Sequence, residues 1–327
     1  MGQVKTHGSP LWLLLLMMSA SLLCCGTASA MGMSFGGQTP PTSEPATGAA
    51  LKITSGPFSS PVGIAPVFAR SGLSYLLVTD AGKRTVSKAD PQHPDNVEEL
   101  FKVDGLPLGI AQDRRFIYVG NRSEGSVDIY HGSRKGLRMA RRIKTDEPMQ
   151  PNDIAIDAGA RQFFVVDGAA NDVKVFTLSG RLVRTIDGFG DLFDPKSVAI
   201  HAKSRSIAVT DAGDPKTGMP ASVQVYDYSG RQLLRKTGGF SAPRGVAVSA
   251  DRLFVADALL GQVLVFDRKT GEYLGAFGSF GTDPGQLLFP IDVAFDEKTE
   301  ALYVVNNRMG RLETFAPTDF QPAEVTQ

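Results

Sequence analysis

The hydrophobic positions along most of this chain recur with a long and steady period. A phrase of proline, any residue, a small or acidic residue, a β-branched residue and alanine occurs six times, at Pro61–Ala65, Pro107–Ala111, Pro151–Ala155, Pro195–Ala199, Pro243–Ala247 and Pro290–Ala294. Successive prolines are 46, 44, 44, 48 and 47 residues apart. A period of this length indicates repeated supersecondary units.

Each phrase is followed by an apolar run that ends in an acidic or amide residue, at Asp80, Asn121, Asp167, Asp211, Asp257 and Asn306. An alternating segment comes next and is clearest at 126–130, 172–176, 222–226 and 262–266. Alternation with a period of two predicts half-buried strands, and a fourth segment closes most units. The side chain that ends each apolar run can cap a turn, so we predict a structural role for it.

Four short strands in a unit of this length, without helical periodicity, are typical of a β-propeller blade. The sequence therefore predicts an all-β, six-bladed propeller over residues 50–319, with four antiparallel strands per blade and a C-terminal tail at 320–327. The last unit lacks an outer strand. We expect the segment that begins at Ala50 to pair with the last blade, closing the ring and removing exposed strand edges.

The first thirty residues differ from the rest of the chain. An apolar run, Leu11–Leu23, follows the basic Lys5 and precedes an Ala-Ser-Ala site that ends at Ala30. This pattern predicts a signal peptide at 1–30, cleaved near Ala30, and hence a periplasmic or secreted protein. A lipid anchor at Cys25 is the alternative, with membrane attachment through that residue alone.

Residues 31–49 are rich in Gly, Pro, Ser and Thr and are predicted to form a flexible linker. Both cysteines precede this linker, so the folded region has no disulfide and no cysteine metal site.

The charge balance bears on the class of partner. The chain has 34 basic and 34 acidic residues, which argues against binding to nucleic acid. One basic segment, starting at Gly132, is predicted to lie on the outer strand of the second blade. It is interpreted as a solvated edge, with an acidic partner or an anionic lipid headgroup as the alternative.

Two stretches resemble a known repeat. GSFGTDPGQLLFPIDVAFD at 278–296 resembles the NHL-repeat signature, and APRGVAVSADRLFVADALLGQVLVFD at 242–267 resembles the rest of a unit. The resemblance covers all six repeats and implies an exported bacterial-type NHL propeller. Similar propellers include peptidyl-hydroxyglycine amidating lyases, metal-dependent lactonases, kinase sensor domains and binding modules, so the resemblance predicts the fold and leaves the function open.

The resemblance directs attention to the mouth of the axial channel, where enzymatic members of this fold hold metal ions. His93, His131 and His201 are predicted to lie on the opposite face. A three-histidine zinc site of the amidating-lyase kind is therefore not supported. No serine or cysteine nucleophile motif is present either.

Five residues are candidates for ligand binding at the channel mouth. Asp153 and Asp292 occupy equivalent positions in blades three and six, which face each other across the ring, and Asn152, Lys196 and Arg244 occupy neighbouring entry positions. Two carboxylates with an amide could hold calcium. The alternatives are a neutralised polar channel, or binding of a carboxylate or phosphate group by the two cations.

A long loop in the fourth blade, Ala212–Ser222, carries Lys216 and Met219 and is predicted to contact a partner. Taken together, the sequence predicts an exported, monomeric, non-enzymatic scaffold for a protein, peptide or glycan of the cell envelope. The alternative is a metal-dependent hydrolase or lyase, lactonase-like or amidating-lyase-like, that uses the channel-mouth carboxylates.

Overall fold

The computed structural model of this protein describes residues 56–133 and 136–323. The predicted signal peptide, the linker, Cys25 and the first residues of the predicted closing strand lie outside the described residues. Among the described residues, no helix has the length and apolar character needed to cross a membrane.

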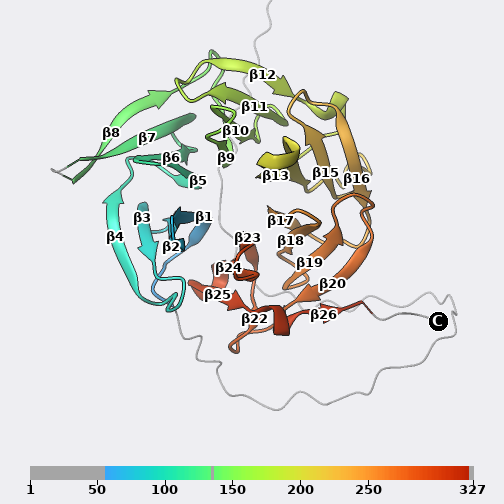
Figure 1. The fold of residues 1–327 in the computed structure, drawn as a ribbon. Coiled ribbons are helices and arrows are strands. Elements are labelled where there is room, and N and C mark those ends of the chain that lie inside the picture. The colour runs from blue at the N-terminus through green and yellow to red at the C-terminus, as the bar shows by residue number, and fades with distance from the viewer. Residues whose placement is uncertain (1–55, 134–135, 324–327) are drawn as a thin grey trace, which may run out of the picture. The chain divides into compact units, whose positions relative to one another are not determined.

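The strands form successive antiparallel sheets around a common axis (Figure 1). Blade one contains β1 (Pro61–Ala69), β2 (Gly72–Asp80), β3 (Thr85–Ala89) and β4 (Val97–Lys102). Blade two contains β5 (Pro107–Asp113), β6 (Phe116–Asn121), β7 (Ser126–Ser133) and β8 (Gly136–Ile143). Blade three contains β9 (Pro151–Asp157), β10 (Gln162–Asp167), β11 (Asp172–Thr177) and β12 (Leu182–Ile186).

Blade four contains β13 (Pro195–His201), β14 (Ser206–Asp211), β15 (Ser222–Asp227) and β16 (Gln232–Thr237). Blade five contains β17 (Pro243–Val248), β18 (Arg252–Asp257), β19 (Gln262–Asp267) and β20 (Tyr273–Phe277), and blade six contains β23 (Pro290–Asp296), β24 (Ala301–Asn306) and β25 (Arg311–Phe315). The remaining elements are the short parallel pair β21 (Ser279–Phe280) and β22 (Gln286–Leu287), and four single-turn 3₁₀ helices at Gly188–Gly190, Ala202–Ser204, Asn307–Met309 and Pro317–Asp319. The prediction of an all-β, six-bladed propeller built mainly of four-stranded antiparallel sheets is confirmed.

The ends of the described chain meet the last two blades. The amide of Gly56 donates to the carbonyl of Met309 at 2.9 Å. The amide of Phe58 donates to the carbonyl of Gly310, also at 2.9 Å. Sheet pairing of the segment from Ala50 stays a prediction, since blade six has three strands among the described residues. In the region expected to be a tail, β26 (Gln321–Pro322) instead pairs with β20 and covers the open edge of blade five.

The hydrophobic core lies between adjacent blades. Each of six clusters combines residues of two neighbouring sheets, as where Phe254 of blade five stacks on Phe295 of blade six with ring centroids 4.4 Å apart. Leu76 of blade one and Val305 of blade six share another cluster, so side-chain packing joins the first and last blades. Every blade therefore buries both of its faces against its two neighbours around the ring.

The predicted structural role of the residues that end the second strands is confirmed. The carboxylate of Asp80 accepts the amides of Ser59 and Ser60, and that of Asp257 accepts the amides of Ser241 and Ala242. In the other four blades, a side-chain oxygen at the end of the second strand likewise accepts a backbone amide of the loop before the inner strand. The accepting residues are Asn121, Asp167, Asp211 and Asn306. These side chains tie the loop that precedes each inner strand to the end of the second strand.

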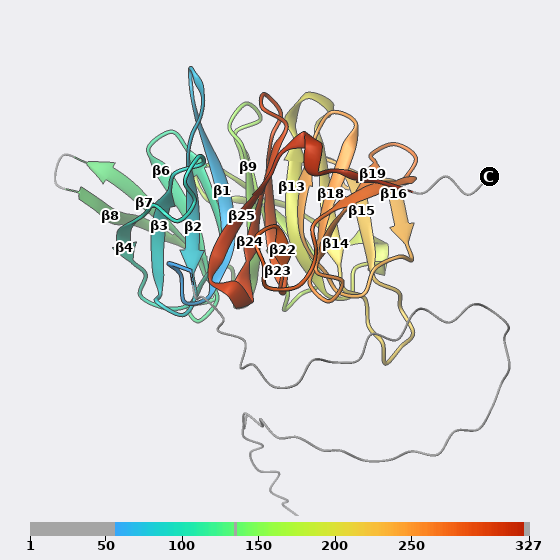
Figure 2. The same cartoon turned by 90° about the horizontal axis from the view of Figure 1, so that it is seen from below.

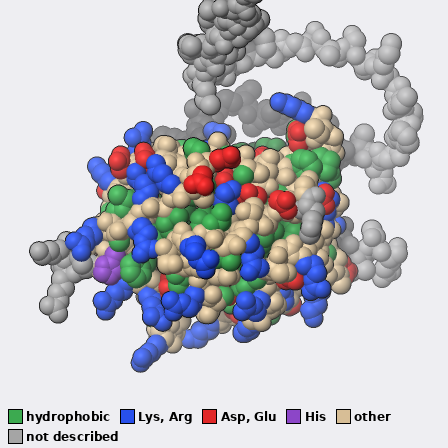
Figure 3. Space-filling model, turned by 90° about the horizontal axis from the view of Figure 1, so that it is seen from above, with side chains coloured by type: hydrophobic (Ala, Val, Ile, Leu, Met, Phe, Trp, Pro, Cys, Tyr) green, Lys and Arg blue, Asp and Glu red, His purple; other side chains and the backbone are tan. Residues whose placement is uncertain are grey.

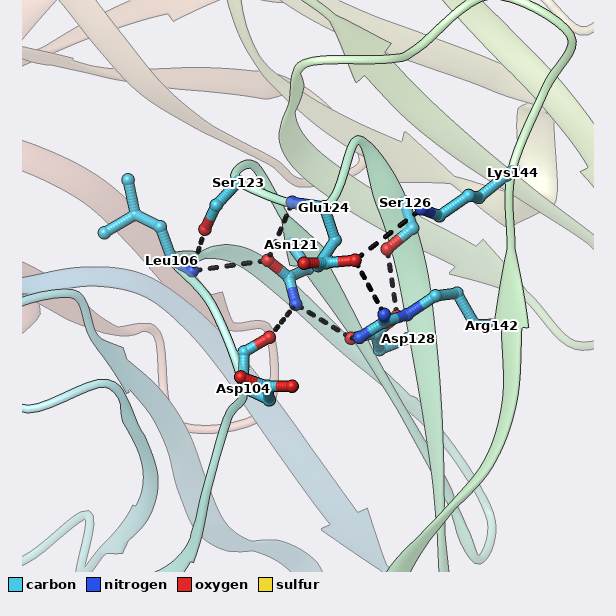
Figure 4. A network of polar contacts seen from close by, with 9 residues as sticks. All are labelled: Asp104, Leu106, Asn121, Ser123, Glu124, Ser126, Asp128, Arg142 and Lys144. Atoms are coloured by element: carbon cyan, nitrogen blue, oxygen red, sulfur yellow. Dashed lines mark hydrogen bonds and ion pairs between the residues drawn. The ribbon is translucent and has the colours of Figure 1, made fainter.

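Blade two contains an additional buried polar network (Figure 4). The carboxylate of Asp128 is fully buried and accepts bonds from Nε and Nη2 of Arg142, at 2.7 and 2.9 Å, and from the side chains of Asn121 and Ser126. Arg142 lies on β8, which contains the basic segment and is the outer strand of this blade, as predicted. The network fastens that outer strand to the middle of the sheet.

Candidate functional site at the channel mouth

A ring of small or acidic residues surrounds the channel axis. It comprises the third residue of each inner-strand phrase: Gly63, Gly109, Asp153, Ser197, Gly245 and Asp292. In every inner strand the pairing register shifts directly after the initial proline, which marks a β-bulge. The ring is crowded because a Cβ on Gly109 would lie 2.3 Å from the Cα of Asp153.

The Asp153 carboxylate bridges two blades. Its Oδ1 accepts the amide of Ile154 at 2.8 Å. Its Oδ2 accepts the hydroxyl of Ser197 at 2.6 Å and the amide of Val198 at 2.9 Å, both from blade four. Ser197 continues the pattern, since its hydroxyl accepts the amide of Val246 in blade five.

Asp292 repeats this geometry three blades away. Its Oδ1 accepts the amide of Val293 at 2.9 Å, and its Oδ2 accepts the amide of Ile64 in blade one at 2.8 Å. The two carboxylates thus use the inward-pointing amides that the bulges release. They hold blade three to blade four and blade six to blade one.

Burial makes ionisation of this pair costly. It raises the pKa of Asp153 to about 6, although the bonds from Ser197, Val198 and Ile154 act in the opposite direction. Burial and the nearby charge of Asp153 raise the pKa of Asp292 well above its ordinary value. The channel axis therefore has less negative charge near neutral pH than two ordinary aspartates would give it.

A cavity of about 250 Å³ lies directly beside this pair. All five residues predicted from sequence line it, namely Asn152, Asp153, Lys196, Arg244 and Asp292. The structure adds Arg122, Ser197, Phe289 and Asn307, which the sequence interpretation missed. Arg122 and Asn307 directly follow the ends of second strands and Phe289 precedes the last inner strand, so their place in the repeat was the available signal.

The cations of the cavity differ in how they are paired. Lys196 forms an ion pair with Asp194 at 2.5 Å, and Arg122 donates to the side-chain oxygen of Gln150 at 3.0 Å. The Nε atom of Arg244 is buried and has no hydrogen-bond partner among the described residues. A buried donor without an acceptor is costly, so Arg244 is the side chain that a bound acceptor would satisfy.

Phe289 lies close to two arginine side chains at this site. Its ring lies below the guanidinium groups of Arg244, at 5.8 Å, and Arg308, at 5.4 Å. The backbone φ of Phe289 is 63°, a left-handed conformation that is strained for a bulky residue. This backbone conformation places the ring within cation–π distance of both arginines.

The donor set at the channel mouth does not fit calcium. A calcium ion takes six to eight oxygen ligands, whereas each oxygen of Asp153 and Asp292 already faces an N–H or O–H donor. Over residues 56–133 and 136–323, no group of three or more His, Cys, Asp or Glu side chains could hold a metal ion. A calcium ion would have to displace these hydrogen bonds, so the geometry disfavours the predicted calcium site, which stays a prediction.

The other sequence candidates lie elsewhere. Lys216 and Met219 belong to the β14–β15 loop, which extends beyond the sheet edges in Figure 2 and is closed by paired bonds between the backbones of Asp214 and Met219. Neither residue lines the channel-mouth cavity. His93, His131 and His201 lie in the β3–β4 turn, near the end of β7 and at the end of β13, and none of these three described histidines lines the cavity.

Comparisons with known proteins agree with the fold. Residues 239–327 match the model of a family described as 6-bladed beta-propeller. No curated protein matches the chain.

Solved structures with a similar fold cover most of the chain. Virginiamycin B lyase from Staphylococcus aureus is 11% identical with a TM-score of 0.57, over 82% of this chain and 85% of that one. A chain of a nidogen/laminin complex is 17% identical with a TM-score of 0.55, over 76% of this chain and 95% of that one. At such identities the likeness concerns the fold alone, and the comparisons assign the protein no activity.

Proposed function

We propose that this protein is an exported, non-enzymatic binding module that recognises a carboxylate or phosphate group of a peptide or glycan at the channel mouth. The observation that carries the proposal is the buried, unpartnered Nε of Arg244 in the wall of a cavity. Guanidinium groups bind carboxylate and phosphate oxygens with two parallel bonds. The Arg244 guanidinium also lies within cation–π distance of the Phe289 ring, at 5.8 Å from its centre.

The electrostatic balance of the cavity also favours an anion. Arg122, Lys196 and Arg244 contribute three positive charges, and among the described residues Lys196 alone of the three forms an ion pair with a carboxylate. The opposing carboxyls of Asp153 and Asp292 have raised pKa values and are turned to amide donors. Asn152 and Asn307 each donate to a backbone carbonyl of a neighbouring blade, which leaves their side-chain oxygens available to ligand donors.

Calorimetric titration with defined probes tests the proposal. The probes are inorganic phosphate, short peptides ending in glutamate, and uronic acid oligosaccharides, each with a neutral analogue. Arg244→Gln should lower the affinity for the best anionic probe roughly 30-fold, which corresponds to about 2 kcal/mol of binding free energy. Arg252→Gln is the matched control, because Arg252 begins β18 and does not line the cavity. Equal binding of anionic and neutral probes would contradict the proposal.

A hydrolase or lyase remains the second candidate, since a carboxyl with a pKa of about 6 in a cavity is a feature of catalytic sites. Virginiamycin B lyase is among the similar structures, and a catalytically inactive variant of it has been solved with quinupristin. Turnover of a lactone or a peptidyl-hydroxyglycine by the purified protein, abolished by Asp153→Asn, would establish this alternative.

Export and monomeric state are part of the proposal. The intact mass of the protein from the producing cell should correspond to a chain that begins near Met31. A mass increased by a diacylglyceryl group at Cys25 would indicate the lipid-anchored form instead. We also propose the Lys216 and Met219 loop as a partner contact, tested by whether Lys216→Ala weakens a captured peptide or glycan.

A further inference from the structure

A second cavity occupies the opposite half of the axial channel. Its volume is about 370 Å³, and residues from the inner strands of all six blades line it, among them Ile64, Ile110, Ile154, Val198, Val246 and Val293. Apart from Gln112 and the two channel aspartates, every lining side chain is apolar. The walls therefore offer a ligand almost no side-chain hydrogen bonds.

Asp153 and Asp292 close this cavity at one end. Both residues line the channel-mouth cavity and the apolar cavity, so their side chains separate the two. Their oxygens point to the amides of neighbouring strands. Burial raises the pKa of both carboxyls, so this end carries less negative charge near neutral pH than two ordinary aspartates would give it.

The opposite end of the cavity is open and apolar. Ile156, Ile200 and Val248 line it and are half-buried, and Phe68 of β1 is 54% exposed. Phe68 lies near the tip of the β1–β2 hairpin, which projects beyond the other sheets in Figure 2. An exposed aromatic ring at the entrance to an apolar cavity is a feature of ligand entry sites.

Arginines occupy the turns that surround this opening in three successive blades. Arg114, Arg161 and Arg205 lie between the first and second strands of blades two, three and four. All three have left-handed backbone conformations, with φ of 53°, 55° and 52°. None of the three forms an ion pair with a carboxylate among the described residues, although the guanidinium of Arg205 lies 5.3 Å from the centre of the Tyr228 ring. Lys and Arg side chains gather along one edge of the propeller in Figure 3.

We propose that the apolar half of the channel binds the alkyl chain of a single-chain anionic amphiphile, whose anionic group stays at the opening near these arginines. An alkyl chain gains from burial along its length against the apolar side chains of the wall. This site is separate from the channel-mouth site and does not rest on the function proposed above.

A homologous series tests the proposal. The full mature protein is titrated calorimetrically with n-alkyl carboxylates from hexanoate to dodecanoate, below their micelle concentrations. Each added methylene should tighten binding about fourfold until the cavity is full. The alcohol of equal length should bind more weakly than the carboxylate, and the alkylammonium most weakly. Affinity that does not change with chain length would overturn the proposal.

Tightest binding by the alkylammonium would overturn it as well, because the headgroup would then lie against Asp153 and Asp292 rather than at the opening.

Substitutions separate the two parts of the site. Val248→Asp places a charge in the cavity wall and should lower the affinity for decanoate at least tenfold. Phe68→Ser should lower the same affinity several-fold. Phe280→Ser is the control, since Phe280 is 63% exposed and does not line the cavity. Because Phe68 is exposed, its substitution tests binding even where Val248→Asp fails to fold.

Charge reversal tests the headgroup. Arg161→Glu should lower the affinity for decanoate and leave the affinity for decanol unchanged. An equal effect on both affinities would contradict the placement of the anionic group. Arg244→Gln should leave the alkyl series unaffected, because Arg244 does not line the apolar cavity. A failure here is therefore distinguishable from a failure of the proposed anion site at the channel mouth.

Discussion

Asp153 and Asp292 occupy the same position in inner strands three blades apart, and each accepts the amide of the following blade, from Val198 and from Ile64. Through these hydrogen bonds, each carboxylate of the pair links its own blade to the next one. It also places two carboxyls between the polar and the apolar cavities of the channel. Their protonation should therefore affect both stability and binding.

The stability contributed by Asp153 should depend on pH. The unfolded chain releases this proton near pH 4, and the folded protein holds it to a pKa of about 6. In that interval the folded state binds more protons, so the free energy of unfolding falls as the pH rises. Replacing Asp153 with Asn removes this term.

In denaturant melts, the stability lost by the Asp153→Asn substitution should be about 2 kcal/mol smaller at pH 7 than at pH 4. Asp95→Asn is the control, because Asp95 is exposed in the β3–β4 turn. A stability difference that stays constant across this range would show that Asp153 is not perturbed.

The glycine beside Asp292 should tolerate no side chain. A Cβ on Gly245 would lie 2.4 Å from the Cα of Asp292, which is backbone and cannot move aside. Gly245→Ala should therefore destabilise the protein by about 1–3 kcal/mol, the usual cost of overpacking. Gly132→Ala should be close to neutral in the same thermal melt, since a Cβ there would lie 3.7 Å from the Leu137 side chain, an ordinary contact distance.

The buried ion pair of blade two gives a third prediction. Arg142→Ala leaves the fully buried Asp128 without its charge partner and should cost about 3–5 kcal/mol. Lys144→Ala should cost less than about 1 kcal/mol, because Lys144 is half-exposed and lies 3.6 Å from Glu124. Similar costs for the two variants in chemical denaturation would contradict the assignment of Asp128 as the anchor of β8.

Metal content distinguishes the hydrogen-bonded pair from a calcium site. The purified mature protein, dialysed against a weak chelator, should contain no stoichiometric calcium by elemental mass spectrometry, because donors already face all four carboxylate oxygens. Stoichiometric calcium that disappears in Asp153→Ala would overturn this expectation and favour the hydrolase or lyase alternative.

The sequence by itself determined the blades and the relative places of five site residues. The period of the proline phrases and the alternation of the strands are local properties of the sequence. In a closed ring of blades, residues at the equivalent position of each repeat lie next to one another around the channel axis. For that reason Asp153 and Asp292 were correctly placed together with Asn152, Lys196 and Arg244.

Only the tertiary structure decided what those residues do. The bulges that turn the amides of Val198 and Ile64 inward depend on pairing between strands. The surroundings of the unpartnered Nε of Arg244 include Phe289 from the next blade. The apolar cavity likewise combines side chains from six inner strands, whose alanine and β-branched residues look in sequence like ordinary core. Hydrogen-bond partners and enclosed volume arise from contacts between distant segments, and no local pattern of residues encodes them.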